Sequence, residues 1–301
     1  MSKQQKERVY PNAMLKDDEG SDLIRNEMNT LILRSIGEEF NRPLGLIANN
    51  CEYLQMHLNH PDGIYSKEKA NDALADINSA TLHLNRLLEN FVEMTASLHG
   101  ALNPSMQLVD LVSVLKSVCA DSAEIYRAIG ITLTVECEGL TQASVIADRG
   151  FAERICLNLL SNALHACTEG EHVVFSLIER EEGYLLTVTD DGYGFPPDSV
   201  LTAFMPCHHR GCVRSEGFER GGGMGLYLCG EYCRLMGWNI NISLQEPGTK
   251  VALEIPRNEQ VYNKTACFHA SEYETQMQSQ LTRMAVLREL RAVHGLEGLR
   301  R

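Results

Sequence analysis

Two things are scarce in this 301-residue sequence: long apolar runs and positive charge. A membrane-spanning helix needs about 20 consecutive, mostly apolar residues, and no stretch approaches that length. The 27 basic residues are outnumbered by 40 acidic ones, which gives a formal net charge of -13. An acidic chain is poorly suited to bind nucleic acids or anionic membranes. We therefore expect no membrane span and no nucleic-acid partner.

A secretory signal is also missing, because residues 1–20 are polar and mixed in charge. The ten cysteines are scattered from Cys51 to Cys267, mostly on apolar faces. Without a secretory signal, such cysteines are typical of buried reduced thiols rather than of a disulfide framework. The hydrophobic fraction of 44% and the charged fraction of 22% are those of a globular protein. We expect a cytoplasmic location.

Glycine, by contrast, is concentrated in one stretch, Arg220-Gly-Gly-Gly-Met-Gly-Leu226. Four glycines in five positions let the backbone adopt positive φ and approach a ligand closely. Apolar residues at helical spacing follow up to Met236, so the loop leads into a helix N-terminus, where unpaired N–H groups favour anions. The stretch predicts a phosphate site, although a flexible hinge can have the same composition.

The N-terminal third predicts two long helices. The first extends from about Ser21 to Leu58, and the breaker Asn59-His-Pro-Asp-Gly63 separates it from the second. Apolar positions in the second helix form the a/d seam of a coiled coil: Ala70, Leu74, Ile77, Thr81, Leu84, Leu88, Phe91, Thr95 and Leu98. An antiparallel helical hairpin cannot bury a whole seam alone. Either two chains complete a four-helix bundle, or the hairpin packs on the chain's own second domain.

Beyond a linker at 99–107, the pattern changes to mixed helices and strands. Further helices are expected at 111–125, at 149–167 and after the glycine stretch. Strands are expected at 131–135, 144–147, 173–178, 184–189, 239–244 and 250–255. A layer of helices on a largely antiparallel sheet is an α/β sandwich, so the fold class is α+β. The expected division is a flexible N-terminus, a dimerisation hairpin, the linker, a sandwich domain and a helical tail, at 1–20, 21–98, 99–107, 108–256 and 257–301.

Two asparagines mark the helix expected at 149–167. Asn158 and Asn162 are four residues apart and share one helix face, while Leu157, Leu160 and Leu164 face the core. The amides either pair with the backbone or supply oxygen ligands to Mg²⁺, which takes few protein ligands when phosphates provide the others.

A second polar motif follows a predicted strand, Val188-Thr-Asp-Asp-Gly-Tyr-Gly194. An Asp-Asp-Gly sequence is typical of a turn, but Asp190 could also accept a hydrogen bond from an adenine amino group, a contact worth roughly 1.5–3 kcal/mol. Phe204 lies just ahead of a polar segment, 207–220, which could cover a nucleotide as a lid.

Taken in this order, the motifs resemble the ATP-binding domain of sensor histidine kinases, within the superfamily of gyrase, chaperone and mismatch-repair ATPases. Asn158 to Asn162 resembles the N box of that family, Asp190 to Gly194 its first glycine box, Phe204 its F box, and Gly221 to Leu226 its second glycine box. The resemblance covers about 108–256 and implies ATP with Mg²⁺.

The resemblance also implies roles for single residues. Asn162 would bind the metal with support from Asn158, and Asp190 would bind adenine. Gly192 and Gly194 would line the base, and His165 stands where the family often has a lysine near the phosphates. The backbone of the second glycine box would hold the phosphates, through Gly221, Gly222, Gly223, Met224, Gly225 and Leu226.

The helical hairpin resembles the family's dimerisation and phosphoacceptor module, whose first helix carries His-Glu-x-x-x-Pro-Leu. Glu39, at the base-like position, Pro43 and Leu44 match that pattern, but Glu38 occupies the histidine position. A carboxylate does not form the stable phosphoramidate that a phosphorelay needs. The resemblance therefore implies a homodimer that does not autophosphorylate at position 38.

Several interpretations of Glu38 remain open. The protein is a kinase relative that regulates a partner such as a response regulator, or it transfers phosphate to another side chain, such as His57, His60, His83 or a residue on a partner. Alternatively, it is an active kinase with a substituted acceptor. A protein of another class, a phosphotransferase-like or anti-sigma-type regulator, would use the nucleotide fold for partner binding.

Two features fall outside the family pattern. Cys207, His208, His209 and Cys212 could hold Zn²⁺ through N and S ligands, although their spacing matches no standard finger. The tail carries an apolar stripe that predicts a helix docked on the body or one that binds a partner or extends the dimer: Met277, Leu281, Met284, Leu287 and Leu290.

Overall fold

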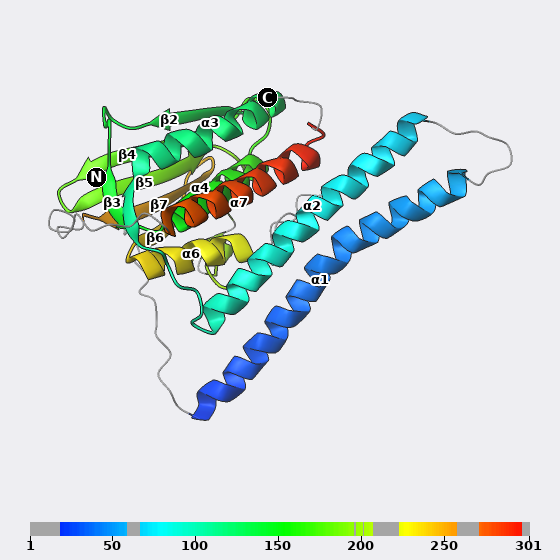
Figure 1. Cartoon of the computed structure of the whole chain (residues 1–301), viewed down its shortest axis with the longest axis horizontal. Helices are drawn as coiled ribbons and strands as arrows, with labels where there is room; N and C mark the ends of the chain where they lie inside the picture. Colours follow the sequence, from blue (N-terminus) through cyan, green and yellow to red (C-terminus); the bar gives the residue numbers. More distant parts are fainter. Residues whose placement is uncertain are drawn as a thin grey trace, which may run out of the picture.

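A computed structural model of the chain describes residues 19–58, 67–195, 197–200, 202–206, 223–257 and 271–296. Two long helices, α1 (Glu19–Leu58) and α2 (Lys67–Leu98), run alongside each other in opposite directions and are in contact (Figure 1). Both lie where the sequence predicts helices. Pro43 lies inside α1, and the helix continues through it.

A mixed five-stranded sheet forms the second part of the molecule, with strand order β2-β4-β5-β7-β6. The strands are β2 (Thr132–Glu136), β4 (His172–Arg180), β5 (Gly183–Asp190), β6 (Asn239–Leu244) and β7 (Thr249–Pro256). Three of the pairings are antiparallel, as expected, whereas β2 pairs with β4 in parallel. Alternate residues of β4 enter the core, because successive side chains of a strand point to opposite faces.

Three helices cover one face of this sheet: α3 (Leu111–Ile129), α4 (Arg149–Ala166) and α6 (Met224–Met236) (Figure 1). Aspartates cap two of them, since Asp110 accepts from the Val112 N–H and Asp148 from the Phe151 N–H. Such caps satisfy backbone donors that have no partner within the helix. A short helix, α5 (Pro197–Val200), follows the first glycine box.

A small second sheet was only half predicted. β3 (Ser144–Ala147) has the expected bounds, and it pairs antiparallel with β1 (Gln107–Asp110). β1 begins at the last residue of the stretch predicted as a linker. Four residues are too few for an alternating pattern to be recognised, so only its partner strand reveals it.

The C-terminal helix α7 (Ser271–Val293) lies on the helical layer, in contact with α2, α3 and α4 (Figure 1). This is the docked arrangement among the alternatives for the tail. The predicted apolar stripe is only partly correct. Leu287 and Leu290 are buried together with Val286, but Leu281 and Met284 are exposed.

A backbone contact beside β5 gives a stability prediction. A Cβ on Gly248 (φ +97°) would lie 1.8 Å from the Asp190 carbonyl oxygen, whereas a Cβ on Gly139 (φ +78°) would meet no atom within 4 Å. Both alanine variants carry the left-handed strain of roughly 1–2 kcal/mol, but only Gly248→Ala adds a clash. We expect Gly248→Ala to lower the free energy of unfolding clearly more than Gly139→Ala, measured in urea. Equal losses would contradict the close packing.

Candidate functional site

Asp190 ends β5 opposite Thr249 of β7 and is only 8% exposed. Its Oδ1 accepts from the Gly192 N–H at 3.2 Å. Burial raises the pKa of Asp190 to about 6, although hydrogen bonds from the Gly192 and Thr249 backbone oppose the shift. A buried carboxylate with a raised pKa gains from any additional hydrogen-bond donor, so Asp190 is suited to bind a ligand N–H group.

The first glycine box lies directly against the end of α4. The Tyr193 N–H donates to the Ala166 carbonyl at 3.2 Å. A Cβ on Gly192 would lie 2.4 Å from the same oxygen, and Gly194 has a φ of +73°. Only glycine fits this close approach and positive φ, so these two glycines bring the loop beside Asp190 and α4.

Asn158 and Asn162 differ in their surroundings. Asn158 is buried at 7% exposure, and its Nδ2 lies 3.4 Å from the Gly225 carbonyl oxygen of α6, to which it donates. Asn162, one turn further along α4, is exposed. The structure therefore links Asn158 to the second glycine box and leaves the Asn162 side chain accessible.

The described end of the second glycine box begins α6. Gly223 (φ +62°) precedes the helix, and no side chain caps its first N–H groups. The side chains of Met224 and Leu226 are buried, so this stretch can offer a ligand backbone rather than side chains. Gly221 and Gly222, like the zinc candidates Cys207, His208, His209 and Cys212, lie outside the described residues.

Phe204 and His165 contact helices. A Cβ on Gly230 of α6 would lie 3.4 Å from Phe204 Cδ1, so the half-buried phenyl ring packs on that helix. The His165 ring, from α4, stacks on His294, just beyond α7, with centroids 6.1 Å apart and planes at 26°. The C-terminal segment thus reaches His165, the side chain for which the family resemblance implies a place near the phosphates.

The kinase-like motif of α1 lies partly exposed. Glu38 is exposed and 3.3 Å from the Nε of Arg34, and Glu39 is half-buried. Phe40 packs edge-on against Phe91 of α2, with centroids 6.4 Å apart. Of the other histidines considered as acceptors, His57 packs beside Tyr53 and His60 lies outside the described residues.

One group of contacts at the site could not be anticipated from local sequence patterns. Arg86 of α2 donates from one terminal nitrogen to Asn158 Oδ1 at 3.3 Å and from the other to Ser161 Oγ at 3.1 Å. Glu289 of α7 accepts from Arg86 at 3.0 Å and lies 2.7 Å from His83 Nδ1. These residues are 72 to 206 positions apart, so no local pattern connects them.

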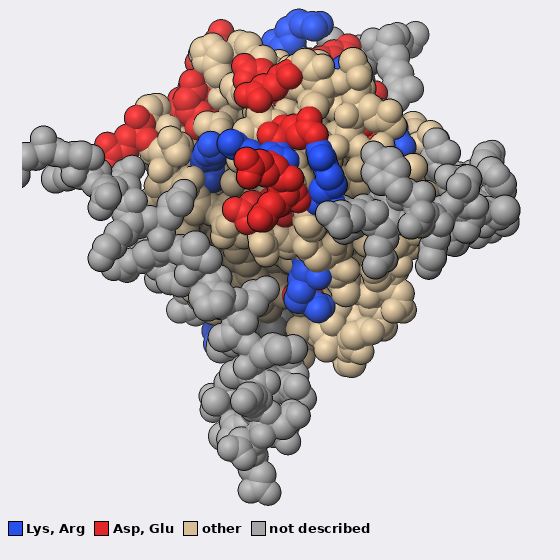
Figure 2. All heavy atoms as spheres, turned by 90° about the vertical axis from the view of Figure 1, so that its left-hand side faces the viewer, with Lys and Arg blue, Asp and Glu red and all other residues tan. Residues whose placement is uncertain are grey.

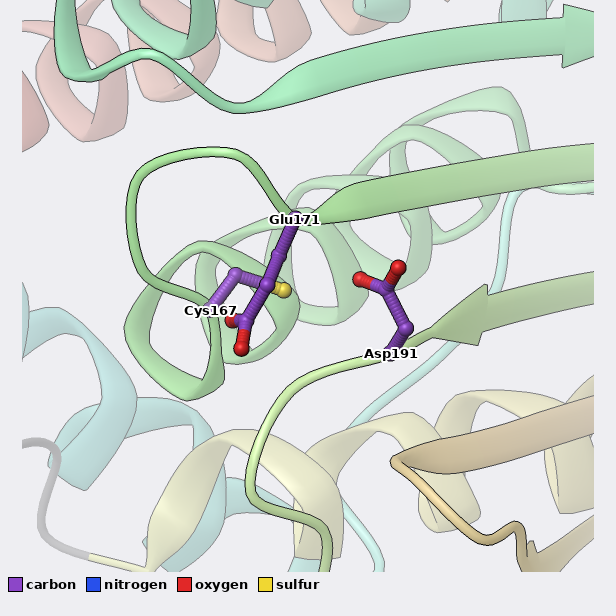
Figure 3. Close-up of side chains that lie close together, drawn as sticks. All are labelled: Cys167, Glu171 and Asp191. Carbon is purple, nitrogen blue, oxygen red and sulfur yellow. The ribbon is translucent and has the colours of Figure 1, made fainter.

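A cysteine and two carboxylates also meet beside the first glycine box (Figure 3). Potential ligand atoms of Cys167, Glu171 and Asp191 lie within 4.8 Å of one another. Both carboxylates already accept backbone N–H groups, Glu171 from Thr168 and Asp191 from His172. Burial, with the nearby acidic groups, raises the pKa of the Cys167 thiol to about 12. The cluster thus serves to close the turn between α4 and β4.

The surface that faces the viewer in Figure 2 carries lysines and arginines interspersed with acidic side chains. A nucleic-acid site normally requires basic residues clustered on one face, and the described residues of this face form no such cluster. Among the helices that the structure describes, none is both long and apolar enough to cross a bilayer.

Comparison with known proteins identifies the second part of the chain. Residues 147–259 match the family described as histidine kinase-, DNA gyrase B- and HSP90-like ATPases. Histidine kinase P4 of Formosa agariphila is 23% identical over 237 residues, which cover 77% of this chain and 17% of the relative. Sensor protein SrrB of Staphylococcus aureus is 22% identical over 242 residues, covering 78% and 39%. The chain therefore spans less than half the length of either relative.

Solved structures show the same fold. Acinetobacter baumannii histidine kinase AdeS is 17% identical with a TM-score of 0.55, and the match covers 73% of this chain and 98% of that one. Histidine kinase ThkA in complex with response regulator protein TrrA is 19% identical with a TM-score of 0.59, covering 81% and 66%. Residues 147–259 therefore form a domain of the histidine kinase-, DNA gyrase B- and HSP90-like ATPase family, and the curated relatives that the chain matches are named as a histidine kinase and a sensor protein.

Proposed function

We propose that this protein is an ATP-binding signal-transduction protein of the two-component type that regulates a partner without autophosphorylation at position 38. The carrying observation is Asp190, a buried carboxylate at the point where the first glycine box meets α4. In this proposal 108–256 form the ATP-binding domain and 21–98 the dimerisation hairpin. The remaining segments are the N-terminus at 1–20, the linker at 99–107 and the tail at 257–301, in a cytoplasmic protein.

The residues present fit ATP. Asp190 would accept from the adenine amino group, while Gly192, Gly194 and the ring of Phe204 would shape the base pocket. Loop backbone without bulky side chains is what a phosphate chain needs, and Gly223 to Leu226 offer it. His165, held beside His294, would lie near the phosphates. Bound ATP would supply the phosphoryl group for any transfer reaction.

The amides of α4 fit Mg²⁺, which prefers oxygen ligands. The exposed Asn162 would bind the metal directly, whereas Asn158, buried on the same helix and bonded to the Gly225 carbonyl of α6, would support it. Glu39 would occupy the base-like position of α1, one residue beyond Glu38.

The surface of α2 supports a homodimer. Leu74, Leu88 and Leu98 of the predicted seam are 54%, 50% and 48% exposed, while Leu87 and Met94 on another face are buried. The two alternatives for the hairpin, packing on the chain's own second domain and completion by a second chain, therefore apply to different faces of α2. One face packs on the chain's own α6 and α7, and the seam would be covered by a second copy in a four-helix bundle.

The exposed carboxylate of Glu38 favours a protein that regulates a partner over an active kinase. This carboxylate is exposed and pairs only loosely with Arg34, at 3.3 Å between partly solvated groups, so it would present permanent negative charge where kinases present histidine. Because a histidine kinase of the same fold forms a complex with a response regulator, a response regulator is the partner we propose. An active kinase with a substituted acceptor is the alternative, and a phosphotransferase-like adaptor would use the same surfaces.

Replacing Asp190 tests nucleotide binding. We expect Asp190→Ala to weaken Mg-ATP binding about tenfold to 100-fold, because a hydrogen bond to a charged group is worth roughly 1.5–3 kcal/mol. The measurement is titration calorimetry, with the neighbouring Asp191→Ala, whose carboxylate bonds to His172, as the matched control. If wild type binds no nucleotide, or if both variants lose affinity equally, the assignment of Asp190 is wrong.

The same variant gives a pH prediction. Adenine favours ionised Asp190, whose pKa is raised to about 6 in the folded protein. Wild-type affinity should therefore fall as the pH drops through about 6, whereas Asp190→Ala should lack this component. The difference between the two curves is the quantity to compare, since the nucleotide phosphates titrate in the same range. Parallel curves would count against the adenine contact.

Glu38 can be tested by restoring the family residue. Incubated with γ-labelled ATP and Mg²⁺, wild type should retain no acid-labile label, because it lacks a phosphoramidate-forming side chain at position 38. Glu38→His should acquire such a label if the rest of the kinase-like site is intact. Glu38→Gln is the control. Acid-labile label on wild type would refute the non-phosphorylating form of the proposal.

The dimer face can be disrupted by one charge. Leu88→Glu should convert a dimer to the 33.6-kDa monomer, because a carboxylate in the bundle seam would be buried without a partner. Leu281→Glu on α7, a site of similar exposure (55% against 50%), should leave the dimer unchanged. Sedimentation equilibrium distinguishes the two masses, and a monomeric wild type would rule out the bundle.

A further inference from the structure

Helix α7 places a buried carboxylate against α2. Glu289 is only 3% exposed. Its Oε1 lies 2.7 Å from His83 Nδ1, and its Oε2 accepts from Arg86 at 3.0 Å. Burial disfavours ionisation of Glu289, but Arg86 and His83 outweigh it and lower the pKa of this carboxyl group. An ionised carboxylate and a guanidinium are thus buried together between two helices that are distant in sequence.

Arg86 continues the contact into the candidate nucleotide site. Its guanidinium donates to Ser161 Oγ and to Asn158 Oδ1 of α4, at 3.1 and 3.3 Å. Asn158 in turn donates to the Gly225 carbonyl of α6. A continuous series of polar contacts therefore connects α7, through α2 and α4, to the second glycine box. We call the Glu289–Arg86–Asn158 part of it the latch.

Other contacts fix α7 on the ATPase domain itself. Arg283 donates to Ser117 Oγ at 2.7 Å and pairs with Asp121 at 3.2 Å, both on α3. Arg291 pairs with Glu124, also on α3, at 2.9 Å. Because α7 is held on α3 in this way, Glu289 is presented to α2 at a fixed position. Helix α2 is joined to α4 and α6 by contacts of its own, Glu93 with Arg154 and Ser97 with Glu231, so a movement of α2 away from α7 must also separate these.

The latch engages the asparagine that would support the metal ligand Asn162. Asn158 Oδ1 accepts from a guanidinium, and the same oxygen cannot also face a metal ion, because the Arg86 cation would lie beside it. Like charges repel strongly at short distance in partly buried surroundings. Arg86 on Asn158 and Mg²⁺ beside Asn158 are therefore competing states.

We propose that the latch is an autoinhibitory contact: while Glu289 holds Arg86 on Asn158, the protein binds the Mg-nucleotide weakly, and separation of α2 from α7 allows tight binding. The inference depends on the proposed ATP site and adds its regulation. Glu289 and Arg86 act by occupying and positioning Asn158, with no contact to the nucleotide. Any partner or signal that moves α2 would change nucleotide affinity through this contact.

Charge removal at Glu289 tests the latch. Breaking a buried ion pair destabilises the contact, since it leaves Arg86 buried without its counter-ion. We expect Glu289→Gln to bind Mg-ADP at least about fivefold more tightly than wild type, the lower end of typical coupling between sites. This gain in affinity should be smaller in EDTA, because no metal ion then competes with Arg86 for Asn158. Glu124→Gln, which removes another α7 ion pair without touching Arg86, is the matched control and should change the affinity less than twofold.

A second variant shows whether the effect passes through Arg86. Arg86→Gln should also bind Mg-ADP more tightly, and Glu289→Gln should add nothing on that background. Weaker binding by Arg86→Gln would identify Arg86 as a phosphate ligand and overturn the latch. Unchanged affinity in both variants would overturn it and leave the ATP proposal intact, whereas absence of binding in wild type and in both variants would overturn both.

Hydrogen exchange of the full chain supplies a readout that does not depend on affinity. Mg-ADP should accelerate amide exchange in the second half of α7 and in the part of α2 around Arg86, because the latch opens on binding. Slower exchange in both segments would show that nucleotide and latch are compatible, and would refute the proposal.

Discussion

The end of strand β5 is held between two backbone segments that approach too closely for a side chain to fit. Gly248 lies against the Asp190 carbonyl on one side, and Gly192 lies against the Ala166 carbonyl on the other. Since only hydrogen atoms project from these glycines toward the contacts, β5, β7 and the end of α4 meet at one point. The position and burial of Asp190, and hence its raised pKa, depend on this convergence.

A second constraint is that the single side-chain amide of Asn158 bonds to two different helices. It donates to the backbone of α6 and accepts from Arg86 of α2, so the side chain that joins α4 to the second glycine box also joins the ATPase domain to the helical pair. Buried polar groups need partners, and the partner of Asn158 Oδ1 here comes from another domain. The chemistry of the site and the docking of α2 are therefore coupled through one amide oxygen.

Helix α2 uses its faces for different contacts. Residues such as Leu87 and Met94 pack within the chain, while Leu74 and Leu88 of the predicted seam are exposed. A pattern in one sequence can identify an apolar face, but it does not say whether the chain itself or a second chain covers it. This is why the sequence left two alternatives for the hairpin, of which the single chain contains the packing of α2 on its own α6 and α7.

Features that depend on neighbouring residues could be predicted from local patterns in the sequence. Helical periodicity located α1, α2, α3 and α4 closely, and alternation gave β3 and β6 their bounds, because both patterns arise within a few residues. Ordered motifs placed the candidate site around Asn158, Asp190 and Gly223. Four features became apparent only in the folded structure: the parallel pairing of β2 with β4, the existence of β1, the buried face of α7 and the contacts of Arg86 with Glu289. These features join residues far apart in the chain, and their geometry is set by packing between elements rather than by local propensity.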